Sequence, residues 1–213
     1  MNKLWAFGDS FTFGHELSDC LTNLEMPLPS QLTYAALLAK ELGYDYECKA
    51  MGYYANNAIT RTVIESIDYI NKDDLVLVMW TFPIRREFML DQGLITIGRE
   101  DDHEFAKHYI KYADLNNHWM IQQSLKDIYM AQELLKNYNY LFLSAVTDLN
   151  RAIVIKNNFD SPLVSRMNIQ RWVILDQQLG FHEWSEQQLN QKFIGHPSDQ
   201  AHRLLATRIK KIL

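Results

Sequence analysis

The sequence predicts an α/β protein in which a parallel sheet lies between two layers of helices. Short apolar segments of strand length alternate with longer segments of helical periodicity along the chain. Residues 75–80 are apolar at every position, which is typical of a parallel strand buried on both faces. The chain has 213 residues, of which 47% are hydrophobic and 22% charged, so we expect residues 1–213 to form one globular domain.

The strands are predicted from apolar runs that end at turn residues. The first run leads into Gly8 and the second into Gly52, and glycine at the end of an apolar run marks a turn. Residues 163–192 are polar and rich in glutamine, so no strand is predicted there. The predicted strands are residues 3–7, 46–51, 75–80 and 140–146.

The helices are predicted from apolar residues that recur three and four positions apart. Ser30 is expected to cap the first helix and Gly43 to end it, and Asn56 or Asn57 is expected to cap the second. The predicted helices are residues 31–42, 57–70, 117–137 and 198–212.

Residues 83–116 interrupt this alternation. The segment is too long for a simple connection between a strand and a helix. Two interpretations are open: a lid or substrate-selecting insertion over the end of the sheet, or a small surface subdomain.

The composition bears on partners and location. The net charge of −5 gives no electrostatic reason to expect binding to nucleic acid. No apolar run approaches the length of a membrane span, and Cys20 and Cys48 suit a reducing compartment, so we expect a cytoplasmic protein that does not enter a membrane. The histidines lack the spacing of a metal site, and neither a metal nor a cofactor is expected.

Two motifs near opposite ends of the chain carry chemistry. Gly8-Asp9-Ser10 directly follows the first predicted strand and places a hydroxyl at the sheet edge where α/β proteins bind ligands. Gly195-His196-Pro197 precedes the last predicted helix. A serine becomes a nucleophile when a neighbouring histidine takes its proton, so the two motifs predict acyl-transfer chemistry if they meet in space.

These motifs, in this order, resemble the SGNH/GDSL hydrolases. The resemblance rests on Gly8-Asp9-Ser10, on Gly52 after the second strand and on His196-Pro197, and it covers nearly the whole chain. It implies a flavodoxin-like three-layer α/β/α fold and the hydrolysis of esters or thioesters. Ser10 would be the nucleophile and His196 the base, while the Ser10 and Gly52 amides would bind the oxyanion.

The sequence departs from the family pattern at two positions. The third strand runs into Thr81-Phe82-Pro83 and offers no asparagine for the oxyanion. Phe193 stands three residues before His196, where the family has an aspartate. We expect Arg85 or Asn56 to supply the missing oxyanion donor and Glu183 or Glu186 to supply the missing acid.

The resulting hypothesis is a serine hydrolase of small esters. O-acetylated carbohydrates, or other short acyl esters, are the substrate class that the resemblance favours. The alternative is an SGNH-fold binding protein that has lost catalytic power, because two family blocks are incomplete. Simpler structural roles are also open: Asp9 as a residue that holds its turn, and Arg85-Arg86-Glu87 as a surface ion-pair cluster.

Overall fold

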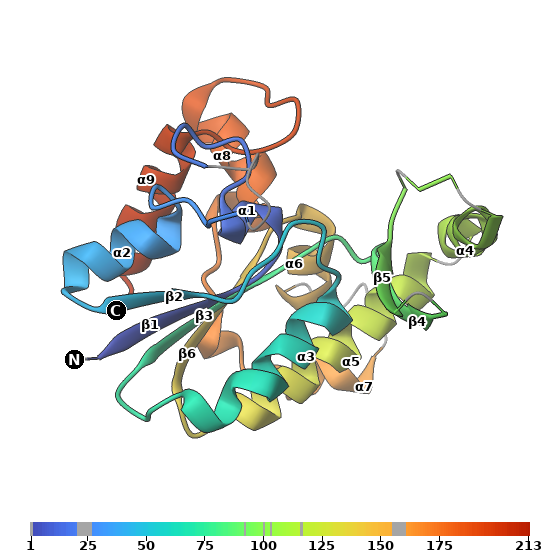
Figure 1. Ribbon diagram of the computed structural model, residues 1–213, viewed down its shortest axis with the longest axis horizontal. Helices are drawn as coiled ribbons and strands as arrows, with labels where there is room; N and C mark the ends of the chain where they lie inside the picture. The colour runs from blue at the N-terminus through green and yellow to red at the C-terminus, as the bar shows by residue number, and fades with distance from the viewer. Residues whose placement is uncertain are drawn as a thin grey trace.

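The computed structural model describes residues 2–20, 27–91, 93–99, 101–102, 104–115, 117–154 and 161–213. Its centre is a parallel four-stranded sheet in the order β2-β1-β3-β6 (Figure 1). The strands are β1 (Lys3–Phe7), β2 (Asp45–Cys48), β3 (Leu75–Trp80) and β6 (Asn139–Ser144). All four predicted strands are therefore present, and every residue of β3 is buried, as its apolar sequence requires.

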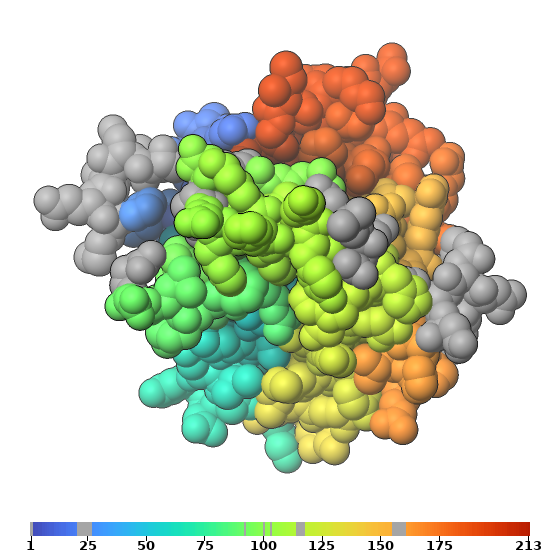
Figure 2. All heavy atoms as spheres, turned by 90° about the vertical axis from the view of Figure 1, so that its right-hand side faces the viewer, coloured from blue at the N-terminus to red at the C-terminus, as the bar shows by residue number. Residues whose placement is uncertain are grey.

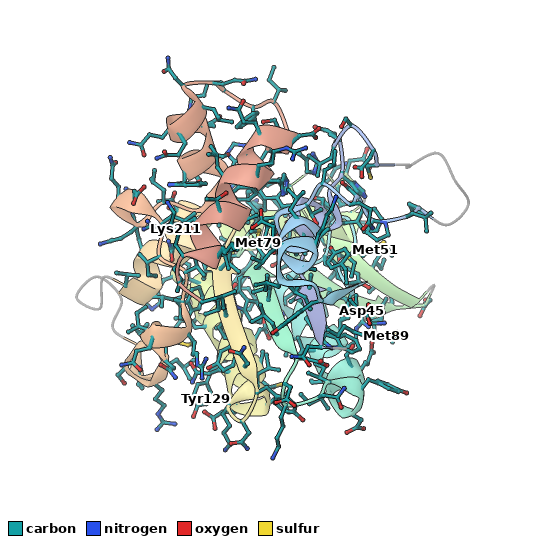
Figure 3. The ribbon with its side chains drawn as sticks, turned by 90° about the vertical axis from the view of Figure 1, so that its left-hand side faces the viewer. Asp45, Met51, Met79, Met89, Tyr129 and Lys211 are labelled. Carbon is teal, nitrogen blue, oxygen red and sulfur yellow. The ribbon has the colours of Figure 1, made fainter. Side chains whose placement is uncertain are left out.

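Helices cover both faces of this sheet. Helices α2 (Tyr34–Leu42) and α9 (Asp199–Lys210) pack together on one face, and α3 (Asn56–Ser66) and α5 (Asn117–Leu135) pack together on the other (Figure 1). The prediction of a three-layer α/β/α sandwich is confirmed. Met79 of β3 lies fully buried in the interior, whereas Met51 and Met89 are exposed (Figure 3).

Helices α2 and α3, the first two that the sequence predicts, do not begin at the predicted residues. Helix α2 begins at Tyr34 because the Thr33 hydroxyl accepts a hydrogen bond from the Ala36 amide at 3.2 Å. Ser30, the expected cap, instead donates its hydroxyl hydrogen to Asp19. Helix α3 has Ala55 at its N-cap position, without a side-chain cap.

The insertion forms a hairpin and a helix. Strands β4 (Arg86–Leu90) and β5 (Gly93–Ile97) pair antiparallel, and α4 (Glu104–Leu115) follows. This part of the chain faces the viewer in Figure 2, where its green atoms lie between the C-terminal residues in red and helix α3 in cyan.

Short elements complete the chain around the carboxyl ends of the strands and beside β6. Trp172 makes an isolated parallel bridge to Phe142 of β6, so residues 163–192 add one bridge to the sheet but no strand. None of the helices in the described ranges combines the length and apolar character needed to cross a membrane. The short elements are α1 (Ser10–Phe13), α6 (Thr147–Val154), α7 (Pro162–Arg166), α8 (Phe181–Leu189), and 3₁₀ turns at Ile67–Tyr69, Ile169–Arg171 and Asp176–Gln178.

His202 links the two helices on one face of the sheet. Its ring is fully buried in α9, and Nδ1 accepts a hydrogen bond from the Tyr34 amide at the start of α2, at 3.1 Å. Burial lowers the pKa of His202 to about 3, because the charged imidazolium would lose its hydration there. The neutral ring therefore acts as an acceptor that caps α2 from another helix.

The His202 contact predicts a loss of stability in acid. Unfolded His202 takes up a proton below about pH 6.5, and the folded protein does not until about pH 3. The free energy of unfolding should therefore decrease as the pH falls from about 6.5 to about 3, and at about pH 4.5 it should be roughly 2.5 kcal/mol lower than at pH 7. His202→Asn keeps an acceptor near the Nδ1 position without titrating, so urea unfolding should show a smaller difference between pH 7 and pH 4.5 in this variant. An equal loss of unfolding free energy in the wild type and in His202→Asn would show that His202 does not cause the acid sensitivity.

Candidate active site

The turn that follows β1 is organised by the Asp9 side chain. Asp9 caps α1, and its Oδ1 accepts a hydrogen bond from the Phe11 amide at 3.0 Å. Its other oxygen accepts hydrogen bonds from the Thr81 hydroxyl and from Arg85 Nη1, the latter at 3.1 Å. Asp9 therefore holds the turn, as the structural interpretation expects, and fixes Ser10 at the N-terminus of α1.

Arg85 is part of this site and is not a surface charge. Its side chain is only 12% exposed, and its guanidinium lies 4.7 Å from the ring centres of both Tyr53 and Phe82. Its Nη1 donates to Asp9 and, at 3.3 Å, to the Thr81 hydroxyl. The cation thus lies beside the Ser10 turn and compensates the fully buried Asp9 carboxylate.

His196 lies next to the same turn, although it comes from the far end of the sequence. Its ring centre is 5.4 Å from that of Phe11, the residue after Ser10. In the described part of the chain, no hydrogen bond reaches the Ser10 hydroxyl. That this hydroxyl lies within hydrogen-bond reach of His196, or one rotamer away in the ligand-free protein, remains a prediction. The two motifs nevertheless lie at the same end of the sheet.

A carboxylate accompanies His196, and it comes from an unexpected position. Glu16 Oε1 lies 3.1 Å from His196 Nδ1, and Oε2 accepts a hydrogen bond from the His196 backbone amide at 3.3 Å. The ring contact is an ion-pair distance, because the ring N–H is not aligned with the carboxylate for a hydrogen bond. Glu16 thus faces Nδ1, and no hydrogen bond to Nε2 of His196 is found among the described residues.

The backbone around Glu16 is adapted to this contact. Glu16 has a φ of 66°, in the left-handed region that residues other than glycine adopt at an energetic cost. Gly195 has a φ of 116°, and a Cβ at this position would lie 3.0 Å from Glu16 Oε2. Both residues therefore hold conformations that bring this carboxylate against His196.

Neither glutamate expected from the sequence plays this part. Glu186 accepts hydrogen bonds from Lys192 Nζ at 2.5 Å and from the Phe193 amide at 3.0 Å. Glu183 lines a cavity, and its buried Oε2 has no hydrogen-bonding partner among the described residues. The prediction that one of them approaches His196 is wrong. It followed the family pattern, in which the acid precedes the histidine in the sequence, whereas the carboxylate beside His196 is Glu16, which follows Ser10.

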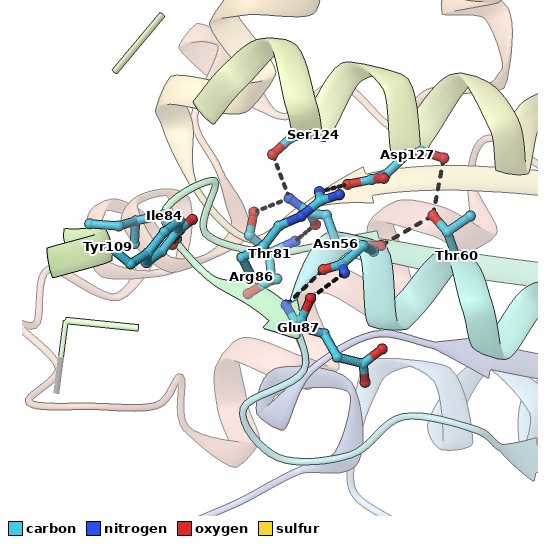
Figure 4. A network of polar contacts seen from close by, with 10 residues as sticks. Asn56, Thr60, Thr81, Ile84, Arg86, Glu87, Tyr109, Ser124 and Asp127 are labelled. Atoms are coloured by element: carbon cyan, nitrogen blue, oxygen red, sulfur yellow. Dashed lines mark hydrogen bonds and ion pairs between the residues drawn. The ribbon is translucent and has the colours of Figure 1, made fainter. Parts of the chain in front are cut away.

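Asn56 is also engaged elsewhere. Its Oδ1 accepts a hydrogen bond from the Thr81 amide at 2.8 Å, and its Nδ2 donates to the Thr81 carbonyl and to the Ser124 hydroxyl (Figure 4). The side chain thus pairs with the backbone at the end of β3 as a neighbouring strand would. Both amide hydrogens have partners, and none points to an oxyanion.

The insertion is attached beside the site by two ion pairs. Arg86 Nη1 lies 2.6 Å from Asp127 Oδ2, and Glu87 accepts hydrogen bonds from Arg61 at 2.8 and 2.9 Å. The side chain of Asn57 exchanges hydrogen bonds with the Glu87 backbone. Burial raises the pKa of Asp127 to about 6. The insertion is therefore fixed to α3 and α5 where it leaves the sheet.

A cavity of about 250 Å³ lies between the sheet edge and the insertion. Phe82 forms part of its wall and also packs edge-on against Phe11, with ring centres 6.3 Å apart. The cavity therefore adjoins the Ser10 turn. It is lined by Phe82, Pro83, Ile84, Arg99, Met120, Val146, Asp148 and Glu183.

Comparisons with known proteins bear on the fold. No protein-family model matches the sequence, and no curated protein matches it significantly. A solved structure of a member of the lipolytic G-D-S-L protein family from Veillonella parvula is 12% identical, with a TM-score of 0.53 over 100% of this chain and 98% of that one. A carbohydrate esterase family 2 enzyme from Corynascus thermopiles is 14% identical, with a TM-score of 0.52 over 99% of this chain and 65% of that one. The chain therefore has an SGNH-hydrolase-like fold.

The Asp9–Arg85 pair predicts a strong effect on stability. Arg85→Met should lower the free energy of unfolding by about 3 kcal/mol, because it leaves a buried carboxylate without its cation. In Asp9→Asn/Arg85→Met the loss should be smaller than the sum of the single losses by about 1 kcal/mol or more. Arg208→Met, which removes an exposed pair with Asp176, is the matched control and should change stability by less than about 1 kcal/mol in urea unfolding. If the loss in the double variant equals the sum of the losses in Asp9→Asn and Arg85→Met, the two charges do not interact.

Proposed function

We propose that this protein is a serine esterase that hydrolyses small esters with short acyl groups. The observation that supports this function best is the association of Glu16 with His196 beside the Ser10 turn. A carboxylate, an imidazole and a serine at one sheet edge are the parts of an acyl-transfer centre. Three-layer folds serve many functions, so the proposal depends on these side chains and not on the fold.

Ser10 attacks the ester carbonyl, and His196 Nε2 takes the hydroxyl proton. The tetrahedral intermediate collapses to an acyl-enzyme, and the alcohol leaves with the proton that His196 returns to it. Water then attacks the acyl group, gives its proton to His196, and releases the acid and free Ser10. Glu16, facing Nδ1, stabilises by its charge the imidazolium that forms twice in the cycle.

Two backbone amides are available to the oxyanion. Ser10 is the first residue of α1, and helix-initial amides have no partner within the helix. In the described part of the chain, neither the Ser10 amide nor the Gly52 amide donates a hydrogen bond. Arg85 lies near the turn and adds positive potential, although its Nη1 is bonded to Asp9.

The cavity beside Phe82 restricts the substrate. Its volume of about 250 Å³ is smaller than that of most ligand pockets, so it suits an acetyl or similar short acyl group. Charged groups from Arg99, Asp148 and Glu183 border it and suit a hydroxylated alcohol such as a sugar. The carbohydrate esterase with the same fold supports an acylated carbohydrate as the substrate class.

Labelling with a fluorophosphonate tests the nucleophile. An activated serine displaces fluoride from phosphorus, so the wild-type protein should be labelled and Ser10→Ala should not. Ser165→Ala removes a serine of α7 outside the site and should be labelled like the wild type. Wild-type protein that stays unlabelled and hydrolyses no p-nitrophenyl acetate would instead support the binding protein without catalysis.

Glu16→Gln should lower kcat/KM by about two to four orders of magnitude. Glutamine keeps the size of the side chain but removes the charge that stabilises the imidazolium, and removal of that charge in serine triads has an effect of this size. Glu186→Gln alters the carboxylate that pairs with Lys192 and should keep a near wild-type rate. The expected difference is measured with p-nitrophenyl acetate; a reversed order of the two variants would assign the acid to Glu186.

A further inference from the structure

His15 is a second imidazole at this site, and no motif of the sequence points to it. It directly follows Gly14, the residue that ends α1 with a φ of 88°. Its ring is half buried, packs edge-on against Phe13 at 4.9 Å and lies 6.0 Å from the His196 ring, both measured between ring centres. The turn after α1 therefore brings a second histidine to the same end of the sheet.

The ring lies directly against Gly52, whose amide is proposed to bind the oxyanion. A Cβ at position 52 would lie 2.5 Å from Cε1 of His15 and 3.0 Å from Nε2. Real Cβ atoms do not approach other atoms so closely, so any side chain at position 52 would displace the imidazole. The imidazole thus occupies the space that a side chain at position 52 would fill.

The nitrogens of His15 are free to bind a ligand. In the described part of the chain, no residue makes a hydrogen bond to either of them. Burial, followed by the proximity of His196, lowers the pKa of His15, so the ring is neutral near pH 7. A neutral imidazole has one N–H donor and adds no positive charge beside the imidazolium that forms on His196.

We infer that His15 is a catalytic residue that donates its ring N–H to the oxyanion of the tetrahedral intermediate, as a third donor beside the Ser10 and Gly52 amides. The inference rests on the proposed esterase function and names a residue that the function did not require. It also accounts for the missing asparagine, because the fold places a different donor against Gly52.

The two other candidates for this donor are engaged in other contacts. Both amide hydrogens of Asn56 are bonded, one to the Thr81 carbonyl at 3.2 Å and one to Ser124 at 3.0 Å. Arg85 Nη1 is bonded to Asp9. His15 combines free donor capacity with contact to Gly52, and preorganised donors at this place stabilise the charge that develops on the carbonyl oxygen.

The test compares two substitutions of similar size. Gln has an N–H donor near the position of Nε2, whereas Met fills the space without a donor. His15→Met should lower kcat for p-nitrophenyl acetate about 100-fold with little change in KM, and His15→Gln should keep kcat within about 10-fold of the wild type. His108→Met, which alters an exposed histidine of α4, is the matched control and should leave kcat unchanged.

The outcomes separate this inference from the proposed function. If Ser10→Ala is inactive and His15→Met keeps the wild-type kcat, or if the Met and Gln variants lose activity equally, the donor role is overturned while the esterase stands. If the wild-type protein has neither labelling nor hydrolysis, the esterase itself fails, and the role of His15 fails with it.

A measurement on the wild-type protein covers the case in which His15→Met does not fold. Fluorophosphonate attached to Ser10 mimics the tetrahedral intermediate, and its oxygen should accept the His15 N–H. In a protein with ¹⁵N-labelled histidine, the His15 ring N–H resonance should move downfield and exchange more slowly with water after labelling. An unchanged resonance would overturn the inference.

Discussion

The site depends on the contacts of one buried group, the Asp9 carboxylate. It is fully buried and joins three segments: the start of α1 through the Phe11 amide, the end of β3 through Thr81, and the start of the insertion through Arg85. A buried carboxylate is tolerated only when cations and hydrogen-bond donors replace its hydration. The three contacts supply them, and they fix the position of Ser10 relative to both the sheet and the insertion.

Two further carboxylates, Glu16 and Asp199, join the two ends of the chain. Glu16 contacts His196, and in the opposite direction Asp199 accepts hydrogen bonds from the Ser18 amide at 3.2 Å and the Ser18 hydroxyl at 2.6 Å. The segment with Glu16 and Ser18 and the segment with His196 and Asp199 thus each provide an acceptor for the other, although they lie about 180 positions apart in the sequence. The carboxylate that would orient the histidine is therefore also one that holds the histidine loop against the serine loop.

Most of the fold follows from local patterns, and the site follows only in part. The strands and the main helices were predictable because their apolar patterns lie within single segments: β3 is a continuous apolar run, and α5 has apolar residues at helical spacing. The caps were predicted less well because distant partners decide them: Asp19 takes the Ser30 hydroxyl, and the end of β3 takes the Asn56 amide. Glu16 could not be predicted because its contact depends on how two distant loops meet. The only feature of the sequence that could have indicated Glu16 is its acidic side chain close after Ser10.

The start of the insertion shows how neighbouring residues divide tasks. Arg85 contacts Asp9 at the site, Arg86 contacts Asp127 of α5, and Glu87 contacts Arg61 of α3. Three consecutive side chains thus tie one segment to the Ser10 turn and to both helices on this face of the sheet. Because each contact is an ion pair at least partly shielded from water, the segment after β3 is held as a firm wall rather than a free loop. Attached in this way, the insertion contributes Pro83, Ile84 and Arg99 to the wall of the cavity beside Phe82.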